Sequence, residues 1–260
     1  MKKMKLGICC PLEDAADAKA AGFDYFEPMF RSFIDMTDDE FAAFKAKVEE
    51  LDFYPLATNV MLPAHAKVTG EEARHGDIRP MLELAFARAE QVGMKSVVFG
   101  SSAARNLPDG FTDRGRGYDQ ITDYVIMAGG IAARHNCVIA VEPLSFREAN
   151  IVNFVAEAAY IAQRANHPNV RALADYFHMT NNREPLSTLY AHGAFLQHCH
   201  VPPPGVRSYT TGIEEYDYKP FFDALKGVGY FENVSVEGRL RGTMAEEGKR
   251  VCEMLRTYAY

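Results

Sequence analysis

The sequence lacks any apolar run of the roughly 18 residues that a membrane-spanning helix requires. The basic opening from Met1 to Lys5 is followed by only a few apolar residues before Pro11, a stretch too short for the core of a signal peptide. We therefore expect neither contact with a membrane nor a secretion signal.

Cysteine is scarce, with five residues and no Cys-x-x-Cys pair. Four of the five lie in or beside short apolar runs: Cys9, Cys10, Cys137 and Cys199. An odd number of cysteines without paired spacing is atypical of a disulfide framework. We expect reduced, buried thiols and hence a cytoplasmic protein.

Positive charge is in deficit, since 28 lysines and arginines face 35 acidic residues and give a formal net charge of −7. A net negative chain repels phosphate backbones, so nucleic acid is not expected as a partner. A small polar molecule, neutral or cationic, is a better match. The hydrophobic content of 48% lets a chain of 260 residues build a full core.

Short apolar runs alternate with longer segments of helical period, and eight such pairs fill the chain. The predicted strands are Leu6–Cys10, Tyr25–Pro28, Leu56–Val60, Ser96–Gly100, Val138–Glu142, Val170–Asp175, Phe195–Val201 and Val234–Glu237. Eight units of about 32 residues predict an α/β fold with one domain over residues 1–260, a (β/α)8 TIM barrel. An open doubly wound sheet would need a glycine-rich turn after its first strand, and Cys9 to Leu12 stand there instead.

Several helix ends carry local signals. Thr37 to Glu40 is a capping box that predicts a helix start, and Thr69 to Glu72 repeats its pattern. Glycine stands where three helices should hand over to a strand, at Gly22, Gly93 and Gly229.

A polar residue ends each of the last four predicted strands: Glu142, Asp175, His200 and Glu237. In a barrel these ends meet at one mouth, where catalytic groups lie. Three clustered carboxylates raise each other's pKa unless a positive charge neutralises them, which favours a divalent metal ion. The mainly oxygen donor set favours Mn²⁺ or Mg²⁺, with Co²⁺ or Zn²⁺ as alternatives. Separate capping or ion-pairing roles for the four residues are the competing interpretation.

Four segments together make the chain resemble the xylose isomerase-like TIM barrel superfamily, in particular its sugar isomerase and epimerase branch. They are Ala140–Leu144, Leu173–Met179, His198–His200, and Asp217–Tyr218 followed by Leu225–Tyr230. The resemblance implies one metal ion bound by Glu142, Asp175, His200 and Glu237. It also implies that Glu142 and Glu237 are the catalytic acid/base pair on opposite faces of a sugar-like substrate.

The same resemblance implies that Glu148, His178 and Arg207 bind the substrate. His65, in the loop after the third predicted strand, faces the same mouth and is a further candidate substrate contact. Side chains two residues apart on a strand point to the same face. His198 is therefore expected to point into the barrel like His200, one layer deeper, as a hydrogen-bonded supporting residue. Glu27 and Asn59 are expected in the pocket wall, without an assigned role.

The chain departs from the family pattern in two places. Pro202 to Gly205 follow His200 where the family has a small residue and then an acid. The sequence also has no tryptophan, which many ketohexose epimerases of this branch use to cover the sugar. The aromatic residues expected as substitutes are Phe30, Phe111, Tyr118, Phe146 and Tyr209.

We therefore predict a metal-dependent isomerase or epimerase that moves a carbon-bound proton of a small polyhydroxy carbonyl compound through an enediolate. A hydroxypyruvate isomerase-like enzyme or an inosose dehydratase-type lyase are the alternatives within the fold. A zinc-dependent apurinic-site endonuclease and a non-catalytic sugar-binding barrel are more remote. The resemblance also makes a homodimer or homotetramer an expected assembly.

Overall fold

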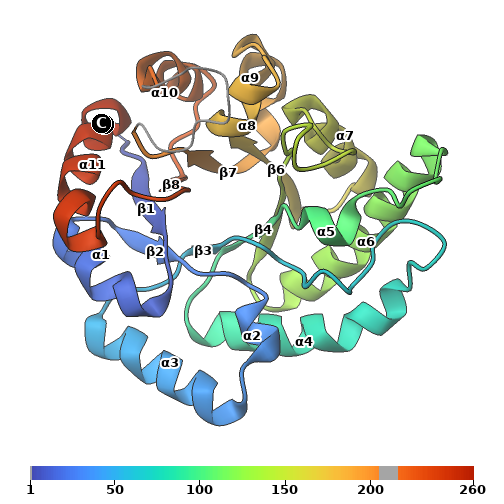
Figure 1. Ribbon diagram of the computed structural model, residues 1–260, viewed down its shortest axis with the longest axis horizontal. Helices are drawn as coiled ribbons and strands as arrows, with labels where there is room; N and C mark the ends of the chain where they lie inside the picture. Colours follow the sequence, from blue (N-terminus) through green and yellow to red (C-terminus); the bar gives the residue numbers. More distant parts are fainter. Residues whose placement is uncertain (1, 205–215) are drawn as a thin grey trace.

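The computed structural model describes residues 2–204 and 216–260, and eight parallel strands form its centre (Figure 1). The strands are β1 (Lys5–Cys9), β2 (Tyr25–Glu27), β3 (Ala57–Thr58), β4 (Ser96–Phe99), β5 (Val138–Val141), β6 (Val170–Asp175), β7 (Leu196–Val201) and β8 (Asn233–Val236). They run side by side in the order β2-β1-β8-β7-β6-β5-β4-β3. All eight predicted strands are confirmed, with bounds that differ by at most two residues.

The barrel closes between β2 and β3 through the residues that follow them. Met29 and Asn59 form an isolated parallel bridge. The backbone N–H of Phe30 donates to the Asn59 carbonyl at 2.7 Å. β3 is shorter than predicted because Val60 takes a positive φ of 44°, which turns the chain out of the sheet. The molecule is thus the predicted single-domain (β/α)8 barrel.

Helices surround the barrel on its outer face (Figure 1). They are α1 (Ala15–Ala21), α2 (Ser32–Asp35), α3 (Asp38–Leu51), α4 (His75–Gln91), α5 (Ser102–Arg105), α6 (Arg114–Arg134), α7 (Val155–Ala165), α8 (Tyr176–Asn181), α9 (Ser187–His192), α10 (Tyr218–Gly227) and α11 (Met244–Ala259). The 3-10 turn η1 (Leu12–Asp14) directly precedes α1, and η2 (Gly193–Phe195) follows α9. Within the described residues, no helix is long and apolar enough to cross a membrane.

The Thr37 capping box is confirmed at the start of α3, where Thr37 and Glu40 exchange hydrogen bonds with each other's backbone N–H groups. The second capping box, predicted at Thr69 to Glu72, was wrong. The Thr69 hydroxyl donates instead to the carbonyls of Arg105 and Asn106, and α4 begins only at His75. For the Thr69 hydroxyl, the carbonyl groups of a distant segment were thus better partners than the backbone of a local helix turn.

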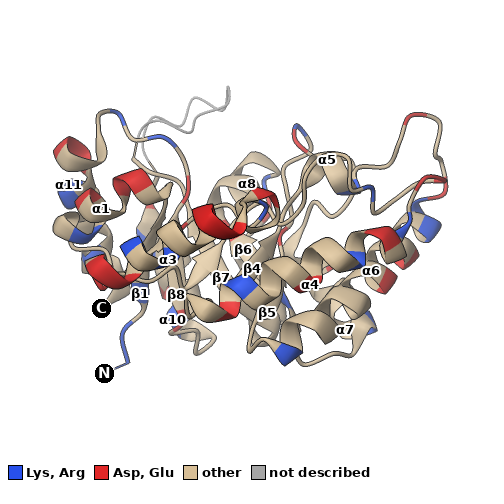
Figure 2. Cartoon of the chain, turned by 90° about the horizontal axis from the view of Figure 1, so that it is seen from below, with Lys and Arg blue, Asp and Glu red and all other residues tan. Residues whose placement is uncertain are grey.

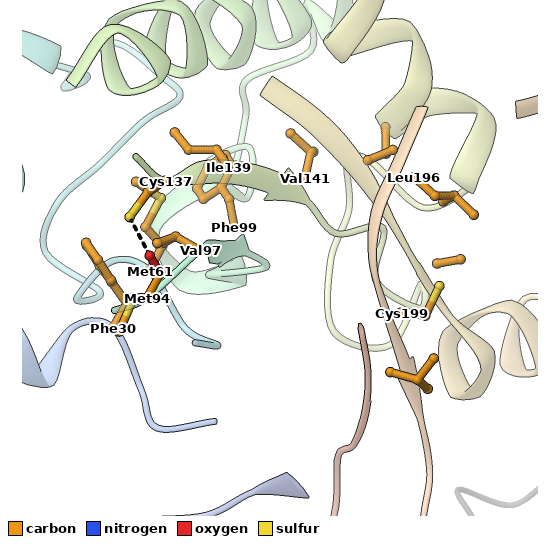
Figure 3. Close-up of a cluster of buried hydrophobic side chains, with 14 of the residues drawn as sticks. Phe30, Met61, Met94, Val97, Phe99, Cys137, Ile139, Val141, Leu196 and Cys199 are labelled. Carbon is orange, nitrogen blue, oxygen red and sulfur yellow. Dashed lines mark hydrogen bonds between the residues drawn. The ribbon is translucent and has the colours of Figure 1, made fainter. Parts of the chain in front are cut away.

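Side chains alternate between two packed layers along each strand. Val97, Phe99, Ile139 and Val141 face the helices and belong to the large core in Figure 3. Val98, Ala140 and Leu173 form a separate cluster inside the barrel. Since successive side chains point to opposite faces, every second residue along a strand shares the inward direction. This parity determines which residues reach the mouth.

Charged side chains lie mainly outside the core, and most of the thiols lie inside it. In Figure 2 the acidic and basic residues lie mainly on the outer helices and loops, and the strands are largely free of them. All five cysteines are free, and four of them are buried.

Candidate functional site

The four polar strand ends converge at one mouth of the barrel. Asp175 and His200 are direct neighbours in the β6–β7 ladder. Glu142 and Glu237 come one residue after β5 and β8, and their backbone N–H groups extend the ladders by donating to Phe99 at 3.2 Å and Val201 at 2.9 Å. All four side chains stand at inward-pointing positions of their strands, so the fold brings together the residues that the sequence pattern selected.

Their donor atoms form a compact set. Nδ1 of His200 lies 3.2 Å from Oε1 of Glu142, 3.4 Å from Oε2 of Glu237 and 3.9 Å from Oδ2 of Asp175. One ligand atom from each of the four residues lies within 4.8 Å of the others. Glu142, Asp175 and His200 are buried, while the Glu237 side chain retains 18% exposure. This spacing and this donor set suit a single divalent metal ion with mainly oxygen ligands.

Glu27 orients the imidazole and was not assigned this role from the sequence. Its two carboxylate oxygens lie 3.0 Å from Nε2 of His200 and 3.0 Å from Nε2 of His198. With the Nε2 proton of His200 donated to Glu27, the lone pair on Nδ1 faces Glu142, Asp175 and Glu237. A carboxylate behind a ligating histidine fixes its ring and tautomer. The available signal was the position of Glu27 at the end of β2, with inward parity.

His198 lies one layer deeper, as its parity predicts. It is fully buried, contacts Glu27 through Nε2, and its ring meets that of His200 edge to face, with centroids 4.9 Å apart. The residue therefore supports the site from below.

Cys9 offers a second grouping of donor atoms with Glu27 and His200, also within 4.8 Å of one another. Burial raises the pKa of the Cys9 thiol well above its ordinary value, and the negative charge of Glu27 adds to this effect. Since a thiol must lose its proton to bind a metal, the four-residue set is the better metal site.

The buried charges favour a cation at this point. Burial raises the pKa of Glu142, and the neighbouring charge of Glu237 raises it further. Burial alone would lower the pKa of His200, but Glu27 and Glu237 outweigh it and hold the pKa well above its ordinary value. Either a proton on His200 or a metal ion can provide the positive charge that this cluster of carboxylates requires.

The residue after β4 is Gly100, which has no side chain that could act as a fifth ligand. An added Cβ at Gly100 would lie 2.0 Å from Oε2 of Glu142, so only glycine allows this carboxylate its position. No side chain from this position has room beside the four predicted ligands.

A cavity of about 190 Å³ is lined by two of the four residues, Glu142 and Glu237, and has Glu148 and His178 in its wall as well. The backbone N–H of Ser145 donates to Nδ1 of His178 at 3.0 Å. The remaining ring nitrogen, Nε2, therefore carries the proton and can donate to an oxygen of a bound molecule.

The other predicted substrate contacts differ in position. Glu148 is half-buried in the wall of the cavity. His65 is exposed beside Ala64, and only Ala64 of the two lines the cavity. Arg207 lies outside the described residues. Arg31, from the loop after β2, lines the cavity and was missed because nothing in its local sequence distinguishes it from a surface arginine.

None of the four described aromatic residues expected to cover the mouth lines this cavity. Phe30 was wrongly expected there, because it is fully buried against Phe86 with ring centroids 4.8 Å apart. Tyr118 donates its hydroxyl proton to Glu157, and Phe146 is 62% exposed. Tyr209 is outside the described residues. Aliphatic side chains of Val60, Leu62 and Leu144 take part in the wall instead.

Comparisons with known proteins agree with this architecture. A family model described as "Xylose isomerase-like TIM barrel" matches residues 15–258. The 3-dehydro-D-guloside 4-epimerase of Escherichia coli (strain K12) is 25% identical over 177 residues, and the match covers 66% of each chain, just under two thirds of that relative's length.

Solved structures resemble the whole chain. The apo form of 3-keto-D-glucoside 4-epimerase from E. coli superposes with a TM-score of 0.81 at 21% identity, covering 98% of this chain and 100% of that one. D-allulose 3-epimerase from Methylomonas sp. gives a TM-score of 0.83 at 19% identity, with 99% of both chains covered. At these identities the two superpositions establish a shared fold.

Proposed function

The chain belongs to the xylose isomerase-like TIM barrel family, and on this basis we propose that it is a divalent-metal-dependent sugar epimerase or isomerase. The proposal is supported by one observation above all: Glu142, Asp175, His200 and Glu237 present their donor atoms within 4.8 Å of one another at the carboxyl ends of four strands. Mn²⁺ or Mg²⁺ suits three carboxylates and one imidazole best.

Two of the four proposed ligands are held in position by hydrogen bonds. Asp175 is held by the backbone N–H groups of Phe177 and His178, which donate to Oδ1 at 2.6 and 3.1 Å. His200 would present Nδ1, with Nε2 bound to Glu27. A bound divalent cation would draw electron density from a carbonyl and an adjacent hydroxyl of the substrate and so make the neighbouring C–H group more acidic.

Glu142 and Glu237 would transfer the proton. They come from β5 and β8, two strands separated in the sheet by β6 and β7, so they approach the cavity from different sides. One carboxylate removes the carbon-bound proton, and the other returns a proton from the opposite direction. Return to the opposite face of the same carbon gives an epimer, whereas return to the neighbouring carbon gives an isomer.

Glu148 and His178 would bind the substrate. Both line the cavity next to Glu142, and the Nε2 proton of His178 is directed by the hydrogen bond at its other nitrogen. An acceptor and a donor in the wall match the hydroxyl groups of a sugar. The proposed substrate is therefore a sugar with a carbonyl group, in accordance with the names of the E. coli and Methylomonas relatives.

Proton exchange in D₂O tests this function. The Mn²⁺-loaded protein is incubated with D-allulose, methyl 3-dehydro-D-glucoside, an inosose and hydroxypyruvate, and each compound is followed by NMR. We expect deuterium at one carbon of a sugar substrate, together with an epimer or isomer that keeps all its oxygens. Loss of an oxygen would identify a dehydratase instead.

The variants Glu142→Gln and Glu237→Gln keep the size of each side chain but cannot act as a base. We expect each to lower exchange by about three orders of magnitude or more, because general acid–base catalysis typically contributes about 10² to 10⁴ and here the same groups also hold the metal. Glu49→Gln, on the exposed face of α3, is the matched control and should exchange at the wild-type rate. Full exchange in both active-site variants would refute the proposed roles.

A further inference from the structure

A second cavity lies beside the first, and neither the predicted ligands nor the proton transfer accounts for it. It measures about 570 Å³ and is enclosed by the loops after β1 and β2 and by one face of α3. We call it the α3 groove. The first cavity, which we call the Glu142–Glu237 cavity, measures about 190 Å³, a third of this volume, and lies below the roughly 300–1,000 Å³ of typical ligand pockets.

The α3 groove adjoins the Glu142–Glu237 cavity. Asn59 lines the groove, and its Nδ2 donates at 3.3 Å to Oε1 of Glu237 in the cavity wall. Val60, the next residue, lines the cavity. Glu27 lines the groove and also binds His200. A molecule held at the predicted metal ligands can therefore extend into the groove past Asn59.

The lining of the α3 groove is apolar. Phe33 and Phe44 form a buried floor, and Leu12, Met29 and Met36 are partly exposed above it. The leucine and methionine side chains above this floor can bind a flat apolar group by burying its surface.

The charges at the α3 groove have one sign. Glu13 and Glu40 are exposed acids at its edge, and none of its described lining residues is a lysine or arginine. An anionic group placed there would be repelled without any compensating cation. The groove thus suits an uncharged apolar group and not a phosphate or carboxylate.

We propose that the α3 groove is a binding subsite for the apolar aglycone of a glycoside whose sugar ring occupies the Glu142–Glu237 cavity. This inference rests on the proposed function for the sugar ring and adds the class of substrate: an uncharged aryl or alicyclic glycoside and not a free monosaccharide. Burial of the aglycone supplies binding energy that a bare sugar lacks.

Paired substrates test the subsite. KM and kcat for solvent-deuterium exchange are measured with methyl, phenyl and 4-carboxyphenyl 3-dehydro-D-glucosides on the Mn²⁺-loaded protein. We expect the phenyl compound to have a KM lower by about tenfold to a hundredfold than the methyl compound, since each 1.4 kcal/mol of added burial corresponds to about tenfold. The 4-carboxyphenyl compound should lose most of this advantage.

Two tryptophan variants locate the effect. Ala43 is exposed on α3 and lines the groove, so Ala43→Trp fills the groove without disturbing the core. Ala42 is the neighbouring exposed position on the same helix and is not part of the groove, so Ala42→Trp is the matched control. We expect Ala43→Trp to raise KM for the phenyl compound to that of the methyl compound, and Ala42→Trp to leave both unchanged.

Saturation-transfer NMR with the same phenyl glycoside measures binding without turnover. Transfer to the phenyl protons that is lost only in Ala43→Trp supports the subsite, even if no compound exchanges and the proposed function fails. Equal KM values for methyl and phenyl compounds, or a phenyl preference that survives Ala43→Trp, would overturn the subsite and leave the proposed function intact.

Discussion

His200 and Glu27 show how one contact can define the chemistry of a residue. The same imidazole could accept or donate at either nitrogen, and the 3.0 Å contact from Nε2 to Glu27 decides which nitrogen faces the other carboxylates. The proposed role of His200 as a metal ligand therefore depends on a residue 173 positions away in the sequence.

Glu27→Gln tests this dependence. Glutamine has one acceptor oxygen and an NH₂ group in place of two acceptor oxygens. It can therefore accept a hydrogen bond from only one of His198 and His200, and the ring of His200 loses its orientation. We expect affinity for Mn²⁺ to fall by about 10- to 100-fold, as for other residues behind a metal ligand. Equilibrium dialysis of Mn²⁺ measures the change. Glu13→Gln, an exposed acid at the α3 groove, should bind Mn²⁺ as the wild type does.

Glu184 gives a pH dependence that is separate from the site. Burial raises its pKa to about 7, although the backbone N–H of Val155 donates to the carboxylate at 3.0 Å and opposes the shift. The folded state thus holds the proton more tightly than the unfolded state, whose pKa is near 4.5. Stability conferred by the protonated side chain is complete below about 4.5 and is lost as the pH rises to about 7.

Glu184→Gln removes this titration and keeps a carbonyl oxygen for Val155. We expect the variant to be more stable than the wild type by about 1 kcal/mol at about pH 8 and to differ little at about pH 5. Urea denaturation at both pH values measures the difference, and Glu49→Gln serves as the exposed control. A variant that is less stable than the wild type at the higher pH would contradict the raised pKa.

Single residues were predictable where strand parity applies. Glu142, Asp175, His200 and Glu237 end apolar runs at regular intervals, so a barrel brings them together. Glu27 ends a strand in the same way but lies in the N-terminal half, where no matching pattern singled it out. Arg31 reaches the cavity from a loop, and loop positions follow no period that a sequence displays.

At the scale of the elements, β1 and β2 approach so closely that a glycine is required. An added Cβ at Gly7 would lie 2.2 Å from the ring of Tyr25. The ring is fully buried, and its hydroxyl is hydrogen-bonded to Ser235 at 2.8 Å, so it cannot retreat without losing that bond.

Gly7→Ala should therefore lower the free energy of unfolding by about 2 to 3 kcal/mol through overpacking. Gly76, in the first turn of α4, is the control because an added Cβ there meets nothing within 4 Å. Gly76→Ala should be neutral or raise stability by up to about 1 kcal/mol. Urea denaturation measures both, and equal stabilities for the two variants would show that Tyr25 yields easily.

Elements were predictable from hydrophobic runs and end signals, and less so where a loop competes. The eight strands and the α3 capping box follow from local residues. The prediction at Thr69 failed because its hydroxyl donates to carbonyls at the end of α5. β3 is short because Asn59 bridges to Met29 and Val60 then turns the chain out of the sheet. Both features depend on contacts between segments that are distant in the sequence, and a local sequence pattern does not predict such contacts.

At the scale of the whole molecule, the two ends of the chain meet on one side of the barrel. The backbone N–H of Met4 donates to Ala259 at 3.5 Å, and α11 packs against α1. The four proposed ligands come from four consecutive strands of this closed structure, so a metal ion would tie together the C-terminal half of the barrel.

Metal binding should therefore stabilise the entire fold. With free Mn²⁺ at about 100 times its dissociation constant, the added stability is about 2.7 kcal/mol, which corresponds to about 5 to 10 °C in Tm for a chain of this size. Differential scanning calorimetry with Mn²⁺ and with EDTA measures this shift. Asp175→Asn should show none of it, and a full shift in that variant would place the bound ion elsewhere.

We propose that the four strand-end side chains hold one divalent metal ion. Titration with Mn²⁺, with the free ion measured by its EPR signal, tests it directly. We expect one tight site per wild-type chain, lost in Asp175→Asn and kept in Glu49→Gln. Absence of tight binding in the wild type, or an unchanged site in Asp175→Asn, would contradict it.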